Sequence, residues 1–574
     1  MAPLIQWAIA LAAASYATAK CYDPSPAFPV PSWNNGAPEN LQPAFQSIQK
    51  KLEALVADKK FDASSFSVAV TSSSETLWSQ YHTAREHNKT RPGDMNVDED
   101  SIYRIASITK TFTTLAILQQ QKAGNLSLDD PIDKYIPELA EENSGALPWK
   151  DITLRILASQ LSGIPREFTM SDLAESFPDP TIIGFPPAKG RLQVCERHGK
   201  RVPCTRKQLL DALKAYKPVF APNQKSTYSN IAFEILGLVI ENVSGLSYEE
   251  YIQEAIFDEV GMPSATISSP RSDGHAVLPV IPNGNFWDND LGIQNPTGGI
   301  FVSSADLTKY VRYIVTHFNS LVTGVNWLMP ASWSVGMNSF YGMPFEIFRT
   351  EKILKDSNRP VTFVTKGGSL PGYYSLILIL EEYGLGITLL VGGQYPLLAQ
   401  IREIVTVELV QHAEAVIWRS IENTHAKRYT AVEPSLNSSL ELAASPSNGL
   451  TLNSFISNGT DIFKTLIPIW VDQREEGVTE PWRIQLVPTY LYKNETNQQG
   501  EIWRMTISYE RDDKQKHDIW DDFCIADIDP VSYDGLPVTE IVFWHEEGKV
   551  ELPAWQVMME VKSDTEMLEV QIDL

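Results

Sequence analysis

The spacing of apolar residues changes once along the chain, at about residue 428. Before that point, segments with apolar residues three or four positions apart predict helices, as where Ile48, Leu52 and Leu55 share one helical face. After it, short runs alternate apolar and polar residues, which is typical of strands. The pattern predicts helices over residues 41–59, 107–124, 152–157, 232–242, 248–260, 306–318 and 397–418.

Strands are predicted at both ends of this N-terminal part. Two short runs near its start are predicted to form a hairpin, and two continuous apolar runs near its end fit strands buried on both faces. These strands cover residues 67–71, 75–79, 374–380 and 386–391. Strands from both ends with helices between them indicate one α/β unit over residues 41–424, preceded by a proline-rich extended lead-in at 20–40.

Residues 425–574 are predicted to form a second domain. Alternating runs at 482–486, 503–509 and 540–544 are separated by turn-forming residues. This pattern of short alternating runs favours an antiparallel β-sandwich or barrel. Its tryptophans fit an aromatic core better than a ligand platform.

Composition narrows the class of protein. The 574 residues are 43% hydrophobic and 10% aromatic, as in a globular protein, and the length favours two or more domains. The formal charge of −24 argues against nucleic acid or an anionic membrane as a partner. The sequence does not indicate an oligomeric state.

The N-terminus resembles a secretory signal peptide. Residues 4–14 form an apolar run of the right length, and Ala17-Thr18-Ala19 is a small-x-small cleavage site, which predicts a mature start near Lys20. We therefore expect a secreted protein without a membrane span. Six Asn-x-Ser/Thr sequons point to a glycoprotein: Asn88, Asn125, Asn242, Asn437, Asn458 and Asn494.

Four cysteines in an oxidising compartment allow three pairings. Cys195 and Cys204 flank a short loop, so local closure favours a disulfide between them. Cys21 would then pair with Cys524 and tie the mature N-terminus to the C-terminal region.

A candidate nucleophile lies in Ser107-Ile108-Thr109-Lys110. On a helix, Ser107 and Lys110 share a face, and a lysine can activate a serine if burial lowers its pKa. Apolar neighbours could supply that burial. The pattern is common by chance, because Ser47 and Lys50 match it in a predicted surface helix.

Two downstream motifs could complete such a site. Tyr228 precedes Asn230 at a helix start, and a phenol near two ammonium groups can act as a base. Lys366 precedes Gly367 and Gly368, where a substrate could lie along a strand edge. Each motif is weak alone, since Tyr492-Lys493-Asn494 matches the first and a lone lysine is usually solvated.

Other chemistries have no signature. The chain lacks Gly-x-Ser-x-Gly, His-x-His, His-Glu-x-x-His and a glycine-rich phosphate loop. We therefore expect neither an α/β-hydrolase elbow nor a metal centre or other cofactor.

Together, Ser-x-x-Lys, Tyr-x-Asn and Lys-Gly-Gly, in this order, resemble the serine β-lactamase and penicillin-binding protein superfamily. Tyr-x-Asn is similar to its class C branch, which includes D-alanyl carboxypeptidases, family VIII-type esterases and the fungal acyltransferase that finishes lovastatin. Further similar segments are 126–137, 152–165, 228–245, 295–307 and 368–375. The resemblance implies a β-lactamase/transpeptidase-like fold, with an antiparallel sheet flanked by helices and an all-helical region.

The resemblance also implies roles for individual residues. Ser107 would be the acyl-forming nucleophile, Lys110 its proton acceptor or electrostatic aid, and Tyr228 the general base and acid. Asn230 would orient the substrate, and Lys366 would bind a substrate carboxylate or support Tyr228. The backbone N–H groups of Ser107 and Ser369 would form the oxyanion hole, beside Gly368.

One departure from the family pattern is the absence of a hydroxyl between Lys366 and the next glycine, which argues against a true β-lactam substrate. We expect a hydrolase acting on a small ester or amide, with a β-lactam or a peptide-like compound left open as the substrate. An acyltransferase on a polyketide-like metabolite and a catalytically idle binding protein are the alternatives. Basic residues at 185–207 suggest a lid over the site that selects anionic substrates, or else a solvated loop.

Overall fold

The computed structural model describes most of the chain in two compact units. The described residues are 27–33, 37–141, 145–167, 173, 179–187, 189, 196–197, 200–201, 203–270, 272–282, 284–318, 325–474, 482–509, 528 and 531–562. The larger unit comprises Ser32–Thr350 and Thr362–Leu409, and the smaller unit comprises Met1–Pro31, Glu351–Val361 and Val410–Leu574. The predicted signal peptide lies outside the described residues.

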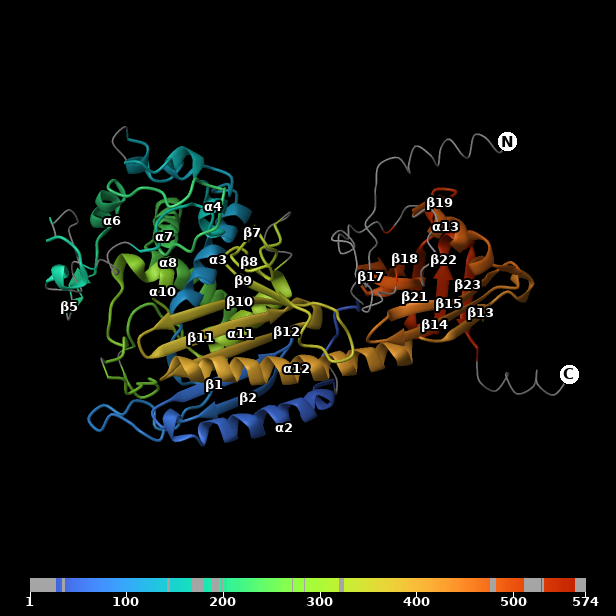
Figure 1. Ribbon diagram of the computed structural model, residues 1–574, viewed down its shortest axis with the longest axis horizontal. Helices are drawn as coiled ribbons and strands as arrows, with labels where there is room; N and C mark the ends of the chain where they lie inside the picture. Colours follow the sequence, from blue (N-terminus) through green and yellow to red (C-terminus); the bar gives the residue numbers. More distant parts are fainter. Residues whose placement is uncertain are drawn as a thin grey trace. The chain divides into compact units, whose positions relative to one another are not determined.

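The larger unit is built on an eight-stranded sheet with the order β2-β1-β12-β11-β10-β9-β8-β7 (Figure 1). Its strands are β1 (Ser65–Thr71), β2 (Thr76–His82), β7 (Ser332–Trp333), β8 (Ser339–Tyr341), β9 (Glu346–Thr350), β10 (Val361–Leu370), β11 (Tyr373–Leu380) and β12 (Leu385–Gly392). As the sequence predicts, strands from both ends of the segment join one sheet: β1 pairs antiparallel with β12, Phe66 opposite Val391. All residues of β12 are buried, as its continuous apolar run predicts, and all residues of its neighbour β1 are buried as well.

Helices supply the rest of the larger unit. They are α2 (Ala37–Val56), α3 (Thr109–Lys122), α4 (Leu154–Ala158), α6 (Arg206–Leu213), α7 (Ile231–Ser244), α8 (Tyr248–Ile252), α9 (Asp258–Val260), α10 (Asn295–Gly298), α11 (Ser304–His317) and the start of α12 (Tyr395–Thr424). Ser47 and Lys51 of α2 both bond to Glu408 of α12, so these helices run side by side (Figure 1).

Two helices form the interior of the helical region. In α3 and α7 almost every residue before the last turn is buried, because each helix is surrounded by other elements. The ring of Phe112 on α3 stacks on Tyr310 of α11, with centroids 3.7 Å apart, and meets Phe257 edge-on. This packing fixes the start of α3, where Lys110 lies. Two short strand pairs, β3 (Ile102–Arg104) with β6 (Phe301–Ser303) and β4 (Glu196–Arg197) with β5 (Lys200–Arg201), complete the unit.

The smaller unit is an antiparallel barrel. Eight strands pair in the closed order β14-β13-β23-β22-β21-β18-β17-β15, with β15 returning to β14. They are β13 (Arg428–Ala431), β14 (Ser439–Ser445), β15 (Gly449–Ser457), β17 (Trp482–Asn494), β18 (Gln499–Tyr509), β21 (Glu540–Trp544), β22 (Lys549–Leu552) and β23 (Val557–Val561). Of the two predicted alternatives, the barrel is therefore correct. The short strands β16 (Thr460–Asp461), β19 (Ser532–Tyr533) and β20 (Leu536–Pro537) lie outside this ring.

The sequence pattern missed one helix in the smaller unit. Helix α13 spans Leu466–Arg474. Nine residues are too few to show a clear helical repeat, and Pro468 in the first turn hides the helix although proline is tolerated there. The predicted loss of helical structure beyond residue 428 is therefore wrong at this point.

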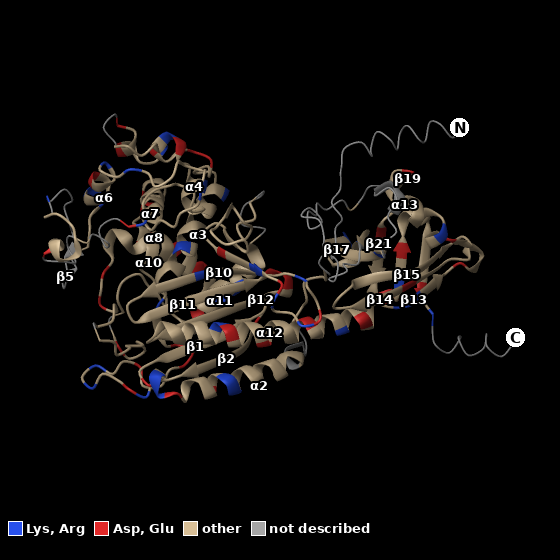
Figure 2. Ribbon diagram, in the orientation of Figure 1, with Lys and Arg blue, Asp and Glu red and all other residues tan. Residues whose placement is uncertain are grey.

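Charged residues of both signs are distributed over both units, and α2 and α12 each carry both (Figure 2). Among the described residues, no single helix is long and apolar enough to cross a membrane. The bent pair Ile231–Ser244 and Tyr248–Val260 passes that test only jointly, with an angle of 81° between its helices.

Candidate active site

Ser107 lies on a strained turn between β3 and α3. The sequence predicts a helix from Ser107, but α3 begins only at Thr109, and Ser107 is in a short 3-10 turn before it. Ala106 adopts a left-handed conformation, with φ of 47°. That conformation costs a residue other than glycine about 1 kcal/mol, and such strain is concentrated at functional sites. Ser107 is half-buried on this turn. Contacts with the rest of the fold must therefore stabilise the turn.

Strands β10 and β11 hold this turn from one side. The hydroxyl of Ser375 donates to the carbonyl of Ile105 at 2.8 Å. A Cβ atom at Gly368 would lie 2.1 Å from that same carbonyl oxygen. Gly368 is therefore needed for the close approach of two backbones, rather than for the substrate contact that the sequence suggested.

Lys110 is completely buried under Ser107. Its Nζ donates to the Ser107 hydroxyl at 3.0 Å and to the carbonyl oxygen of Thr297 on α10 at 2.8 Å. Burial lowers the pKa of Lys110, and although Tyr228 raises it, the charge of Lys366 lowers it again, so that the net pKa lies below the usual value. Lys110 can therefore exist as the neutral amine, which accepts a proton.

Tyr228 lies among three cations. Its ring centroid is 5.2 Å from Nζ of Lys110, 5.2 Å from Nζ of Lys366 and 4.6 Å from the guanidinium carbon of Arg166. Burial raises the pKa of Tyr228, but the charges of Lys110 and Lys366 and a hydrogen bond with Ser107 lower it more, against a smaller opposing effect of Glu346. The net pKa is lowered, which favours the phenolate at a lower pH than for a free tyrosine.

Lys366 is paired with a carboxylate that the sequence did not reveal. Its buried Nζ donates to Oε1 of Glu346 on β9 at 2.8 Å, and the backbone N–H of Gly367 donates to Oε2 at 3.2 Å. Burial lowers the pKa of Lys366, but Glu346 and Tyr228 raise it above the usual value. The protonated form of Lys366 is thus favoured, and its ammonium group is paired with Glu346.

Asn230 is engaged from its amide end. Its Nδ2 donates to Oε1 of Glu167 at 2.6 Å, and its backbone N–H donates to the carbonyl of Arg166 at 2.8 Å. Within the described part of the chain, the buried Oδ1 of Asn230 has no hydrogen-bond partner. That oxygen is an acceptor at the candidate site without a partner among the described residues, and the orienting role of Asn230 stays a prediction.

Ser369 lies on β10 next to Gly368, opposite Tyr374 of β11, and is exposed. The close approach of Gly368 to Ile105 puts this part of β10 beside the Ser107 turn. The oxyanion hole formed by the N–H groups of Ser107 and Ser369 stays a prediction.

The structure therefore brings the three sequence motifs into one place. The residues that sequence reasoning missed are Thr297, Glu346, Glu167 and Arg166. Glu346 precedes Lys366 by 20 residues on a neighbouring strand, and no local motif marks it. The two other sequence matches to these motifs make different contacts. Ser47 bonds to Glu408, and the backbone N–H of Tyr492 donates to Glu495.

The other predicted residues are accounted for as follows. All six sequon asparagines are exposed, which sugar attachment requires but does not prove. Cys204 is buried and disulfide-bonded. Its predicted partner Cys195 and the pair Cys21 and Cys524 lie outside the described residues, so both pairings stay predictions. Of the predicted basic lid, residues 188, 190–195, 198–199 and 202 also lie outside them. Arg206 and Lys207 lie on α6, where they pair with Glu138 and Asp211. The lid itself stays a prediction.

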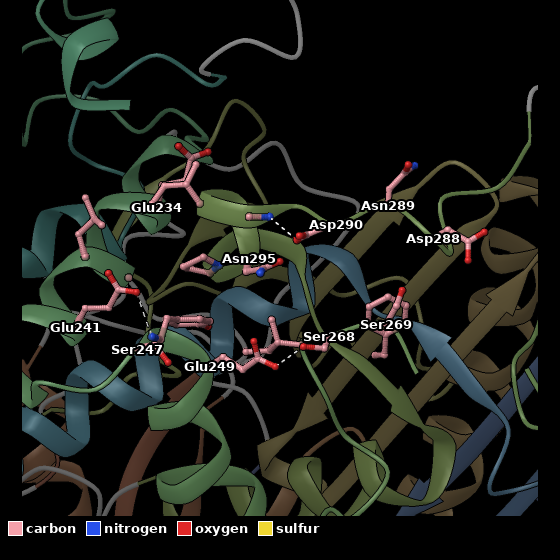
Figure 3. Close-up of a pocket in the computed structure, with 18 residues that line it drawn as sticks. Glu234, Glu241, Ser247, Glu249, Ser268, Ser269, Asp288, Asn289, Asp290 and Asn295 are labelled. Atoms are coloured by element: carbon pink, nitrogen blue, oxygen red, sulfur yellow. Dashed lines mark hydrogen bonds between the residues drawn. The ribbon is translucent and has the colours of Figure 1, made fainter. Parts of the chain in front are cut away.

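A cavity of about 490 Å³ is lined by residues of α7, α8 and α10, among others (Figure 3). Neither Ser107 nor Lys110, Tyr228 or Lys366 lines it. Its wall includes Pro296, the residue before the Thr297 carbonyl that holds Lys110. The cavity carries the carboxylates Glu234, Glu241, Glu249, Asp288 and Asp290 (Figure 3).

Comparisons with known proteins cover both units. The β-lactamase family model matches residues 48–410, and the model of a β-lactamase-like C-terminal domain matches residues 418–563. A "Probable hydrolase clz13" of Cochliobolus lunatus is 32% identical over 559 residues, which are 92% of this chain and 88% of that protein. A "Probable hydrolase M10" of a Phoma species is 31% identical over 545 residues, 91% and 87% of the two chains.

Two solved structures are similar at lower identity. A class C β-lactamase is 18% identical with a TM-score of 0.48, over 66% of this chain and 98% of its own. A D-stereospecific amidohydrolase from Streptomyces is 22% identical with a TM-score of 0.45, over 62% and 97%. The family match confirms the predicted β-lactamase-like fold with a C-terminal domain of antiparallel strands. The chain belongs to the β-lactamase family, in the company of fungal proteins described as probable hydrolases.

Proposed function

We propose that this protein is a secreted serine hydrolase that cleaves a small ester or amide through an acyl-enzyme on Ser107. The observation that carries the proposal is the contact of 3.0 Å between the Ser107 hydroxyl and the buried Lys110 amine, beside Tyr228. A serine within reach of a group with lowered pKa is the arrangement that nucleophilic catalysis needs. The family match and the exposed sequons support the hydrolase and its secretion.

The reaction begins with removal of the Ser107 proton. Tyr228 as phenolate, or Lys110 as neutral amine, accepts this proton while Oγ attacks the substrate carbonyl carbon. The charge that develops on the carbonyl oxygen is stabilised by backbone N–H groups of Ser107 and Ser369. The protonated base then gives its proton to the leaving group, and water repeats the cycle on the acyl-enzyme.

The Lys366 side of the site favours a substrate without a carboxylate next to the scissile bond. The Glu346 carboxylate already accepts hydrogen bonds from the Lys366 ammonium and the Gly367 N–H. A substrate carboxylate would therefore have to displace Glu346. A second anion beside Glu346 would also be repelled. Of the two predicted roles of Lys366, support of Tyr228 is therefore favoured over carboxylate binding, which agrees with the departure from the β-lactam pattern.

A hairpin beside Tyr228 adds an apolar surface. Trp333, Val335 and Met337, on and between β7 and β8, are 74%, 101% and 91% exposed. The hydroxyl of Ser226 donates to the Trp333 carbonyl at 2.6 Å, which ties this hairpin to the segment leading to Tyr228. We infer that this surface contacts an apolar part of the substrate.

Labelling with a fluorophosphonate, read by intact-protein and peptide mass spectrometry, tests the nucleophile. We expect one adduct on Ser107 in wild type and none in Ser107→Ala. Ser47→Ala is the matched control, because Ser47 has the same sequence motif but bonds to Glu408, and it should be labelled like wild type. Equal labelling of wild type and Ser107→Ala would reject the proposal and favour the idle binding protein.

A second measurement separates hydrolysis from acyl transfer. The acyl-enzyme formed from a neutral p-nitrophenyl ester is partitioned between water and an added alcohol. For a hydrolase, the free acid dominates at moderate alcohol concentrations. Exclusive formation of the transfer product would make the acyltransferase the correct alternative.

A further inference from the structure

The barrel contains a cluster of metal-binding side chains outside the candidate active site. His425 follows the end of α12, Glu501 lies on β18, and His545 directly follows β21. On neighbouring strands, Glu501 lies opposite Phe543, and His545 is two positions beyond Phe543 on the same side of the sheet. The three residues are 76 and 44 positions apart along the chain, so no sequence motif connects them.

The ligand atoms converge on one point. Oε2 of Glu501 lies 3.1 Å from Nε2 of His425 and 2.7 Å from Nε2 of His545, and all three atoms lie within 4.8 Å of one another. Tetrahedral zinc, with bonds of about 2.0–2.1 Å, separates neighbouring ligand atoms by about 3.3 Å. To admit the ion, the Glu501 oxygen would withdraw by about half an ångström. The two histidine Nε2 atoms, which lie within 4.8 Å of each other, would move to the same separation.

The surroundings orient the ligands. The other ring nitrogen of His425, Nδ1, lies 2.7 Å from the Thr424 hydroxyl, which leaves Nε2 to face the cluster. The rings of Trp503 and Phe543 lie 5.2 and 4.6 Å from the His425 ring and shield it. His425 and Glu501 are 5% and 8% exposed, whereas the side chain of His545 is 43% exposed.

We propose that His425, Glu501 and His545 bind one divalent transition-metal ion, with zinc as the best fit. Two imidazole nitrogens and one carboxylate oxygen suit zinc, whereas calcium and magnesium prefer oxygen ligands alone. The exposed side of His545 leaves the fourth coordination position to water. This site is independent of Ser107, and it contradicts the expectation from the sequence that the protein holds no metal.

Zinc content measures the site directly. Untagged full-length protein is incubated with ZnCl₂, freed of excess metal by gel filtration, and analysed by mass spectrometry of the element. Wild type and Ser107→Ala should each retain about one zinc per chain, and His545→Gln should bind zinc at least about tenfold more weakly. His275→Gln, which changes an exposed histidine outside the cluster, is the matched control and should bind like wild type.

Cobalt substitution gives a second readout. Co²⁺ in a four-coordinate site absorbs strongly in the visible range, so wild type should show this band and His545→Gln should not. Glu501→Gln, checked for folding by circular dichroism, should also lose it. A wild type that binds no zinc or cobalt, or a His545→Gln protein that binds them equally, would show that the cluster is only a hydrogen-bonded triad and overturn the proposal.

Discussion

The Lys110 side and the Lys366 side of the candidate active site have similar burial but opposite electrostatics. Both lysines are completely buried, and each Nζ lies 5.2 Å from the centre of the Tyr228 ring. Lys110 bonds to a hydroxyl and a backbone carbonyl, whereas Lys366 bonds to the carboxylate of Glu346. The pKa is lowered for Lys110 and raised for Lys366.

This difference separates a base from a fixed charge. Burial alone disfavours an ammonium ion, so a lysine without a carboxylate partner becomes an effective proton acceptor. A carboxylate at 2.8 Å reverses that effect, and such a lysine can act only through its charge. Tyr228 lies near both lysines, and their positive charges, while both lysines are protonated, lower the pKa of Tyr228 on balance. The following variants test this division.

Lys110→Met should have the largest effect. The variant keeps the length and burial of the side chain but removes the proton acceptor, so kcat/KM for a neutral p-nitrophenyl ester should fall by about 10³-fold. Lys50→Met is the matched control, because exposed Lys50 belongs to the second Ser-x-x-Lys match, and it should leave kcat/KM unchanged. A folded Lys110→Met protein within about tenfold of wild type would show that Lys110 is not needed for proton transfer.

Tyr228→Phe should come next, with a loss of about 10²-fold, because Lys110 can still accept the serine proton but no phenol protonates the leaving group. The loss should be greatest for esters with poor leaving groups and smallest for p-nitrophenyl esters, which leave without a proton. Tyr492→Phe, in the second Tyr-x-Asn match, should behave like wild type. Equal losses for good and poor leaving groups would contradict the acid role of Tyr228.

Lys366→Met should reduce kcat/KM by roughly tenfold at neutral pH, as expected for loss of a charge rather than of a base. The charge of Lys366 lowers the pKa of Tyr228, so its removal should raise that pKa. The phenolate then forms only at higher pH, and the acid limb of the pH profile of kcat/KM should move to higher pH. Lys355→Met is the control and should leave the acid limb unchanged. An unchanged acid limb in Lys366→Met would show that Tyr228 is not the group that titrates.

The sequence predicts one of these two sides better than the other. Ser107 and Lys110 are three residues apart, so helical geometry alone brings their side chains together and the motif can be identified. The partner of Lys366 depends on the register of β9 against β10, which a single sequence does not reveal. The contact of Asn230 with Glu167 depends in the same way on the path of a loop.

The same limit explains the other differences between prediction and structure. The strained φ of Ala106 is imposed by Ser375 and Gly368, more than 260 residues away, and so local propensity predicted a helix already at Ser107. Alternating apolar and polar residues predict the strands of the C-terminal domain, and so its class. They do not predict that pairing of β14 with β15 closes the sheet into a barrel. His425, Glu501 and His545 are too far apart in the sequence to form a motif, although the folded barrel brings them together.

Glu346→Gln should have the smallest effect on the neutral ester, about threefold or less, but should change the selectivity of the site. The amide keeps the size of the side chain and removes the negative charge, so the Lys366 ammonium becomes available to an anionic substrate. The ratio of kcat/KM for a p-nitrophenyl hemisuccinate to that for the butyrate should rise by about tenfold, the equivalent of one recovered charge interaction.

The pH profile makes this last prediction decisive. The carboxylate of Glu346 raises the pKa of Tyr228, so its removal should lower that pKa and move the acid limb to lower pH, opposite to the shift in Lys366→Met. Glu351→Gln removes an exposed charge close by in the sequence and should change neither selectivity nor profile. If Glu346→Gln shifted the limb without changing selectivity, Glu346 would tune Tyr228 but would not exclude carboxylates, and the two sides would differ in proton transfer alone.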